Sequence, residues 1–112
     1  GEKADTAVMY GNQAFRNVVV EGEKGHYMVT GEARLFEGQF MYAVSDGHNY
    51  LVEESAMIDG GNGAPDFSPF RIEISIPQSD WPENGTLTLE IYEISAKDGS
   101  RTNELIIPLE QF

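Results

Sequence analysis

The feature that most constrains the fold of this chain is an alternation of apolar and polar residues with a period of two. The alternation is clearest over residues 70–76 and 86–91, where every second residue is Phe, Ile or Leu and the residues between are Arg, Glu, Ser or Thr. Successive side chains of a β-strand point to opposite faces, so this pattern predicts strands with one buried face. Further segments with strand character cover residues 15–20, 27–35, 40–44, 50–52 and 105–109.

Turn-forming residues separate these segments at intervals of roughly 8–12 residues, which is typical of a sandwich or a barrel. Asp46-Gly47 and Asp98-Gly99 each supply a glycine, which adopts positive φ without steric cost. No stretch has the period of an amphipathic helix. We therefore predict an all-β fold, an immunoglobulin-like antiparallel β-sandwich of about seven strands. A small barrel stays open as the alternative, because alternation alone does not separate the two.

A few residues interrupt the alternation and predict local features of the sheets. Gly31 and Ala33 are small residues inside a strand, which indicates close approach by another chain segment or sheet. Ile94 is out of phase with the preceding strand, which indicates a bulge near Tyr92-Glu93. Pro108 cannot donate a ladder hydrogen bond, so its strand is expected at a sheet edge or a bulge.

The length of 112 residues fits one domain, because domains most often span about 100–150 residues. Residues 1–13 are polar and weakly patterned, so we predict a flexible leader or linker there and the sandwich domain over residues 14–112. Met9 and Tyr10 either dock on the domain or belong to the linker. The chain begins with Gly1 and not with Met, and we expect a trimmed start that is compatible with the removal of an export signal.

Acidic residues dominate the charge, since 19 Asp and Glu stand against 7 Lys and Arg and give a formal net charge of −12. Phosphate contacts need clusters of Lys and Arg, so the composition argues against nucleic acid, anionic membranes and anionic wall polymers as partners. A cation, a neutral glycan or a basic protein surface suits it better, although solubility alone also explains the charge. The absence of cysteine excludes disulfides and thiolate chemistry. No apolar segment approaches the ~18 residues of a membrane span.

Several sequence motifs resemble one bacterial domain family. They are Val29-Thr30-Gly31-Glu32-Ala33, Phe36-Glu37-Gly38, Gly85-Thr86-Leu87-Thr88-Leu89, and Glu93-Ile94-Ser95-Ala96-Lys97-Asp98-Gly99 followed by Ile107-Pro108-Leu109. From Phe15 to Leu109 the chain resembles the immunoglobulin-like domain associated with bacterial spore germination and sporulation. The resemblance implies an exported, cell-surface or lipoprotein-associated module without catalytic residues. It identifies no ligand.

These observations lead to two hypotheses of different class. In the first, the chain is a non-catalytic extracytoplasmic protein-interaction, adhesion or scaffold module, linked to the cell envelope or to spore germination. Its partner is an unidentified protein or envelope component, contacted through an open strand edge or the loop tips. In the second, the chain binds a glycan or small ligand of the cell wall through Trp81 and the loop Asp59–Asp66. Neither hypothesis calls for a cofactor or for insertion into a membrane.

Trp81, Tyr50 and Phe67 are the candidate binding residues. An exposed Trp stacks on a sugar ring or anchors a protein interface. A Trp in a sandwich crossover also closes the open end of the core, and for Trp81 this closure is the favoured interpretation. Phe70 shares the phase of the isoleucine-rich strand and is assigned to the core.

Asp59, Asn62 and Asp66 lie in a glycine-rich segment between two strands. Calcium takes carboxylate, amide and backbone oxygens as ligands, so these three residues are the candidate metal site. Their spacing is not that of an EF-hand, and no Glu stands at the offset of its bidentate ligand. An ordinary solvated turn is therefore the favoured interpretation, with calcium as the alternative.

No pattern points to catalysis, and we predict that the chain is not an enzyme. Glu53 and Glu54 are adjacent, so on a strand their side chains point to opposite faces and cannot flank a glycosidic bond together. His26 and His48 are the only histidines, and without further ligands nearby they are interpreted as surface residues and not as a zinc site. No Gly-x-Ser-x-Gly nucleophile motif occurs.

Overall fold

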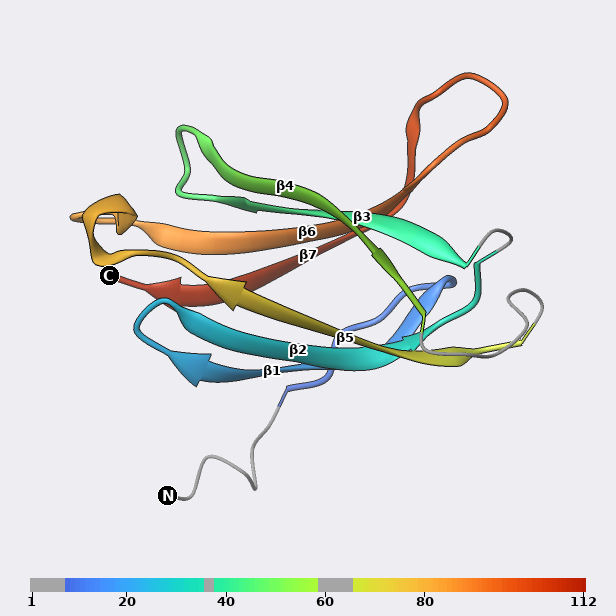
Figure 1. The fold of residues 1–112 in the computed structure, drawn as a ribbon, viewed down its shortest axis with the longest axis horizontal. Helices are drawn as coiled ribbons and strands as arrows, with labels where there is room; N and C mark the ends of the chain where they lie inside the picture. Colours follow the sequence, from blue (N-terminus) through green and yellow to red (C-terminus); the bar gives the residue numbers. More distant parts are fainter. Residues whose placement is uncertain (1–7, 36–37, 59–65) are drawn as a thin grey trace.

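The computed structural model describes residues 8–35, 38–58 and 66–112, which form two β-sheets packed face to face (Figure 1). The elements in chain order are β1 (Phe15–Glu23), β2 (His26–Ala33), β3 (Gln39–Ser45), β4 (Tyr50–Met57), β5 (Ser68–Ser75), the short 3₁₀ helix η2 (Gln78–Asp80), β6 (Thr86–Ile94) and β7 (Arg101–Gln111). One sheet has the strand order β1-β2-β5 and the other β4-β3-β6-β7, with antiparallel pairing throughout. The predicted seven-stranded antiparallel sandwich is confirmed.

One face of each sheet contributes to a common core. In β5 the burial follows the sequence alternation residue by residue, with Phe70, Ile72 and Ile74 buried and the residues between them exposed. Aromatic rings from both sheets meet edge to face: Phe70 lies 5.0 Å from Phe40 and 6.2 Å from Phe15, centroid to centroid. The assignment of Phe70 to the core is confirmed, and such ring pairs add about 0.5–1.5 kcal/mol beyond the area that they bury.

Close packing explains the glycine in the middle of β2. A Cβ atom on Gly31 would lie 2.9 Å from Cγ2 of Val18 and 3.0 Å from Cζ of Phe70. Because protein interiors are packed as densely as organic crystals, neither neighbour has free space into which to move. Val18 and Phe70 belong to β1 and β5, the neighbours of β2 in the same sheet, so the close approach comes from side chains of this sheet and not from another chain or sheet.

β1 contains a bulge that the alternation did not predict. Phe15 and Val18 are both fully buried, although a regular strand places residues three apart on opposite faces. Asn17 adopts a φ of 54°, and the register with β2 shifts between Arg16 and Val19. Asn tolerates this left-handed conformation better than most residues, so it lets the strand turn both apolar side chains inward.

Two predicted irregularities of the larger sheet are confirmed. The register between β6 and β7 shifts between Ile91 and Glu93, which is the bulge expected near Tyr92-Glu93, and Ile94 is accordingly exposed. Pro108 lies in β7, an edge strand, next to a second register shift. The ladder therefore loses no interior hydrogen bond to the proline.

The residues before β1 contact the domain. Tyr10 exchanges backbone hydrogen bonds of 2.9 and 3.0 Å with Val18, and the side-chain amide of Asn12 donates to the carbonyl of Asn103 in β7 at 2.9 Å. Of the two alternatives for this segment, docking therefore holds for Tyr10, while the side chain of Met9 stays exposed. The division into leader and domain at residue 13 stays a prediction.

Candidate functional site

Trp81 closes one end of the sandwich. The residue follows η2, and its indole Nε1 donates to the carbonyl of Ile76 at 3.0 Å. The ring lies against Phe112 at a centroid distance of 5.2 Å and packs on the core. Gly25 makes room for it, because a Cβ there would lie 2.7 Å from Nε1 of Trp81. This geometry agrees with the favoured interpretation of Trp81 as a cap on the core.

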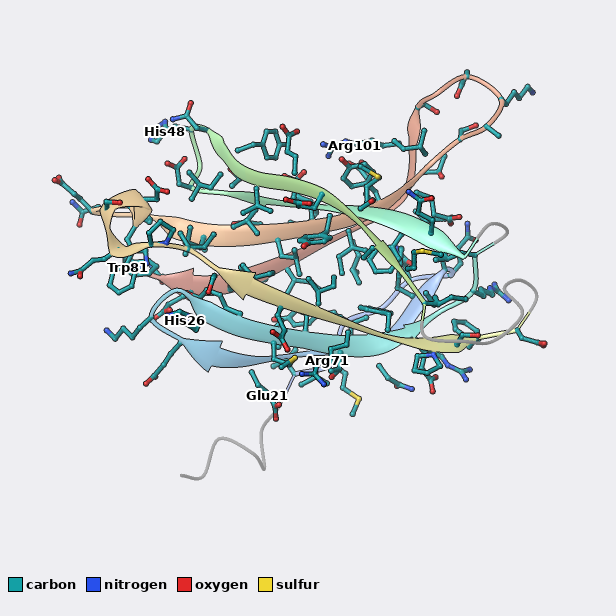
Figure 2. The ribbon with its side chains drawn as sticks, in the orientation of Figure 1. Glu21, His26, His48, Arg71, Trp81 and Arg101 are labelled. Carbon is teal, nitrogen blue, oxygen red and sulfur yellow. The ribbon has the colours of Figure 1, made fainter. Side chains whose placement is uncertain are left out.

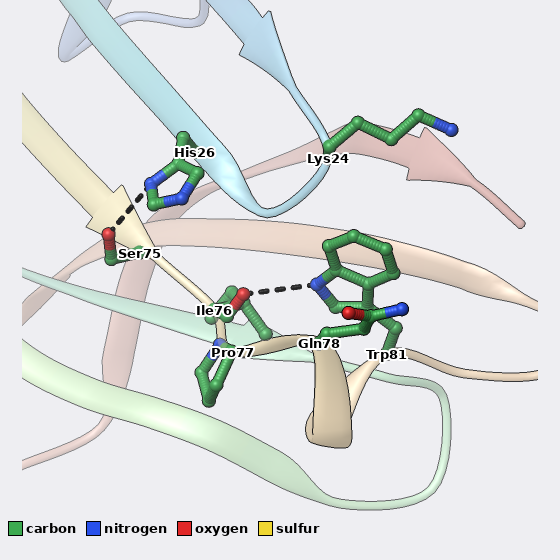
Figure 3. Close-up of a pocket in the computed structure, with 7 residues that line it drawn as sticks. All are labelled: Lys24, His26, Ser75, Ile76, Pro77, Gln78 and Trp81. Carbon is green, nitrogen blue, oxygen red and sulfur yellow. Dashed lines mark hydrogen bonds between the residues drawn. The ribbon is translucent and has the colours of Figure 1, made fainter.

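The exposed side of the same indole lines a shallow groove of about 490 Å³ (Figure 3). In Figure 3 the indole and His26 lie on opposite sides of Ile76, and Nδ1 of His26 is 3.0 Å from the hydroxyl of Ser75. The residues that line the groove are Lys24, His26, Ser75, Ile76, Pro77, Gln78 and Trp81. The surface of the groove is mainly apolar, with a few polar groups at its rim.

A buried tyrosine ties the neighbouring β1–β2 hairpin to β7. The hydroxyl of Tyr27 donates to a carboxylate oxygen of Glu110 and accepts the backbone N–H of Gly25 at 3.1 Å. The same carboxylate oxygen accepts the backbone N–H of Lys24 at 2.7 Å. Burial, reinforced by the hydrogen bond to Glu110, raises the pKa of Tyr27 to about 12. Glu110 thus joins the two sheets at the end that Trp81 closes.

Tyr50 belongs to a second surface, on the outer face of the four-stranded sheet. Its hydroxyl donates to Oε1 of Glu90 at 2.9 Å, and Arg101 donates to the same oxygen at 2.7 Å and to Glu104 at 3.2 Å. The guanidinium also lies over the ring of Tyr92, 3.9 Å from its centroid. We call these five residues, Tyr50, Glu90, Tyr92, Arg101 and Glu104, the Arg101 cluster.

The hydrogen bonds of the Arg101 cluster shift the pKa values of two of its members. The bond to Glu90 is the main cause that raises the pKa of Arg101, and a bond to the same carboxylate raises the pKa of Tyr50. Arg101 keeps 31% of its side chain exposed and Glu90 keeps 17%. The cluster is therefore an ordered polar and aromatic surface that solvent still reaches.

Phe67 lies on a third surface, just before β5. The guanidinium of Arg16 stacks on its ring at 3.8 Å from the centroid, and that of Arg34 lies at 5.3 Å. Arg16 also pairs with Glu32 of β2. The ring is half-buried under these cations, so its contacts are those of a packed side chain at the end of the small sheet.

The structure does not bring the three candidate aromatic residues together. Phe67 precedes β5 and Trp81 follows it, and eight residues of strand span about 26 Å. Figure 2 shows Trp81 at one end of the sandwich, beside η2. Arg101 lies far from Trp81, on the outer side of the four-stranded sheet. Each aromatic residue therefore belongs to a separate surface, and no single small ligand contacts all three.

The candidate calcium residues Asp59 and Asn62 lie outside the described residues. Asp66 is described and is exposed at a bend. No group of three or more potential metal ligands occurs within residues 8–35, 38–58 and 66–112, so the calcium site stays a prediction. His26 and His48 are both exposed, as expected of surface histidines.

The sequence did not single out Arg101 or Glu90 as members of a site. A signal was present, because a hairpin closed by Asp98-Gly99 brings the two flanking strands together. The bulge at Ile91/Glu93 shifts the register between them, however, so sequence spacing alone does not identify the neighbours of Arg101.

One comparison with known proteins gives a match. A family model described as the immunoglobulin-like domain of bacterial spore germination matches residues 17–100. This range includes β2 to β6 and the quoted motifs up to Gly99, whereas Ile107-Pro108-Leu109 lies beyond it. No curated protein and no solved structure matches the chain. No helix in the described part of the chain is long and apolar enough to cross a membrane.

Proposed function

The chain belongs to the family of immunoglobulin-like domains of bacterial spore germination, and from this membership we propose that it is a non-catalytic, extracytoplasmic protein-interaction module. Domains of this family are generally non-catalytic. The partner is a protein or a protein component of the cell envelope. The proposal places the contact on the outer face of the four-stranded sheet.

The observation that carries the proposal is the Arg101 cluster. Tyr and Arg are enriched among the residues that dominate binding energy at protein interfaces. Here Tyr50 and Arg101 are held in place by Glu90 before any partner arrives, so little side-chain entropy is lost on binding. Ile106 pairs with Glu90 across the ladder and is 53% exposed, which adds an apolar contact beside the charged ones.

The test is capture of a partner from an extracytoplasmic fraction on immobilised wild-type and variant domains. We expect Arg101→Ala and Ile106→Ser each to weaken capture about tenfold, since truncation of a central interface residue costs above ~1.4 kcal/mol. Arg71→Ala is the matched control, because Arg71 is also exposed and paired with a carboxylate, but on the other sheet. Circular dichroism and melting temperature establish that each variant is folded.

Two results would count against this proposal. One is a partner that both variants retain at wild-type strength. The other is a cytoplasmic location, since the proposal requires that the protein lies outside the cytoplasm. Protease treatment of intact cells that leaves the protein untouched, together with its recovery in the cytoplasmic fraction, would contradict the extracytoplasmic part.

A second candidate function, the binding of a glycan or small ligand of the cell wall, is favoured by the groove beside Trp81. The indole offers a flat apolar surface of the kind that stacks on sugar rings. Asp66, which ends the Asp59–Asp66 loop, lies at the opposite end of β5 from Trp81, so the groove would act without that carboxylate. Trp81 is the only tryptophan, and its fluorescence reports directly on a screen of muropeptides and glycans. Unchanged emission throughout the screen would contradict this function.

A further inference from the structure

The two open sheets have four edge strands, namely β1, β5, β4 and β7. An edge strand exposes backbone N–H and C=O groups that accept an added strand, and natural proteins block most such edges. The first half of β1 is covered by the chain itself, because Tyr10 exchanges both backbone hydrogen bonds with Val18.

Proline blocks β5. In an antiparallel ladder, alternate residues direct their backbone groups to the neighbouring strand, and the residues between them direct theirs away. The N–H of Ile76 donates to the carbonyl of Gly25 at 2.7 Å, next to the continuous register of β2 and β5. Counting back from Ile76 in steps of two directs the backbone groups of residues 74, 72, 70 and 68 toward β2, so those of Pro69 face outward and this edge lacks one N–H donor. The outward N–H groups of Arg71, Glu73 and Ser75 remain, but Glu73, the only carboxylate of β5, is paired with Arg71, so this edge carries no uncompensated negative charge.

Proline also blocks β7. Gly85 and Phe112 exchange backbone hydrogen bonds at the end of the β6–β7 ladder. Residue 85, just before β6, and residues 87 and 89 within it therefore direct their backbone groups toward β7. Ile107 pairs with Leu89 after the register shift, so the backbone groups of Pro108, the next residue, face away from β6. The exposed edge of β7 therefore lacks an N–H donor near its C-terminal end.

β4 has no such block among the residues that the structure describes. Its register with β3 is continuous over residues 52–57, it contains no proline, and no other described segment pairs with its outer side. The N–H of Ile58 donates to the carbonyl of Gly38 at 3.0 Å, which fixes the direction of the backbone groups along the strand. Three residues accordingly direct their N–H and C=O groups outward: Glu53, Ser55 and Met57.

The charge on β4 selects the kind of partner. Glu53 and Glu54 are exposed and stand on opposite faces, opposite Ala43 and Tyr42 of β3. Neither carboxylate forms an ion pair with a cation in the described part of the chain, whereas Glu90 in the same sheet is paired with Arg101. The edge thus combines free backbone groups with uncompensated negative charge.

These features favour one occupant. Only an extended polypeptide matches a row of N–H and C=O groups at strand spacing. A second copy of this chain is disfavoured, because two molecules of net charge −12 repel one another and residues 50–57 include no Lys or Arg. Lys or Arg side chains on an added strand would lie beside Glu53 and Glu54, where opposite charges stabilise cross-strand pairs.

We infer that the outer edge of β4 is the docking site for an extended, lysine- or arginine-bearing segment of the partner protein, which joins the four-stranded sheet as a fifth strand. The inference rests on the proposed function, because it names the chemistry of the partner and the edge that it uses.

Synthetic peptides test the strand pairing directly. The probe is a heptapeptide in which Lys alternates with Val, titrated calorimetrically into the 112-residue domain. A second peptide carries N-methyl groups on every residue, with the charge unchanged. An added strand directs either its Lys or its Val N–H groups at β4, and the methylated peptide has neither, so we expect it to bind at least about tenfold more weakly than the unmethylated peptide.

Variants of the domain test the location. Ser55→Pro removes an outward N–H and keeps the bonds to β3, so we expect it to weaken peptide binding about tenfold. Ser55→Val, which keeps the N–H, is the matched control. Glu53→Gln with Glu54→Gln should weaken binding about tenfold, whereas Glu21→Gln, on the small sheet, should leave it unchanged. Amide hydrogen exchange should show new protection at residues 53–57.

Three results would overturn the inference. They are equal binding of the methylated and unmethylated peptides, new protection on β5 in place of β4, and dimerisation of the free domain through β4 in sedimentation analysis. The proposed function is judged separately, through capture of the natural partner. If capture depends on Arg101 and the peptide does not pair with β4, the inference fails while the proposed function stands.

Discussion

Replacement of Tyr27 by Phe removes the hydroxyl that ties the β1–β2 hairpin to β7. The ring stays and the core volume is nearly conserved, so packing changes little. The buried N–H of Gly25 loses its acceptor and Glu110 loses a donor. A buried donor without a partner costs about 1–3 kcal/mol, and we expect that loss in the free energy of unfolding of Tyr27→Phe at pH 8.

The pH dependence separates this loss from a packing effect. The pKa of Tyr27 is raised to about 12 in the folded protein, against 10.0 for an unperturbed tyrosine. A raised pKa means that the contribution is complete below pH ~10 and is lost as the pH rises toward 12. From the two pKa values, Tyr27 loses about 1.4 kcal/mol of its contribution to the free energy of unfolding at pH 11, and about 2.7 kcal/mol at a pH well above both values. The stability difference between wild type and Tyr27→Phe should narrow by these amounts.

The assay is urea denaturation between pH 8 and pH 11, followed by the fluorescence of Trp81. Tyr50→Phe is the control, because the hydroxyl of Tyr50 also donates to a carboxylate but at the exposed surface, where such bonds contribute little. A difference between wild type and Tyr27→Phe that stays constant over this range, or widens, would refute the reasoning.

Three further changes test other parts of the structure. Gly31→Val overpacks the core against Val18 and Phe70 and should lower the free energy of unfolding by about 1–3 kcal/mol in thermal denaturation; an unchanged value would show that these two side chains can move aside. Pro108→Val restores an outward N–H on β7, so the Lys-Val peptide should protect amides of β7 as well as those of β4 in hydrogen exchange, at an unchanged melting temperature; protection of β4 alone would argue against the proline as an edge block. The backbone N–H groups of Asn49 and His48 lower the pKa of Asp46, so its contribution is complete above pH ~4 and is lost as the pH falls. The melting temperatures of wild type and Asp46→Ala should therefore differ at pH 7 and converge near pH ~2, and a gap that persists in acid would contradict this.

The strands and several irregularities were predictable because their causes are local. Burial of one face alone produces the alternation in β5, and out-of-phase Ile94 marks the bulge in β6. Pro108 excludes itself from an interior ladder position by its own chemistry. The bulge at Asn17 was not predictable, because a polar residue at that position also fits a regular strand and its positive φ leaves no trace in the alternation.

The candidate site was less predictable, because it depends on contacts between distant residues. Tyr27 and Glu110 are 83 positions apart, and no local pattern links them. Trp81, Tyr50 and Phe67 have similar chemistry, but the order and register of the strands distribute them over three surfaces. The free edge of β4 becomes visible only once the pairing of every other edge strand is known.

The central claim is that the domain contacts its partner through the four-stranded sheet. Site-specific photo-cross-linking in living cells tests it most directly, with the photoreactive residue placed at Ser55 on the edge of β4, at Ile106 on the outer face, or at Gln78 beside the Trp81 groove. We expect a cross-linked partner protein from Ser55 and Ile106 and none from Gln78. A cross-link from Gln78 alone would contradict the claim and direct attention to the groove.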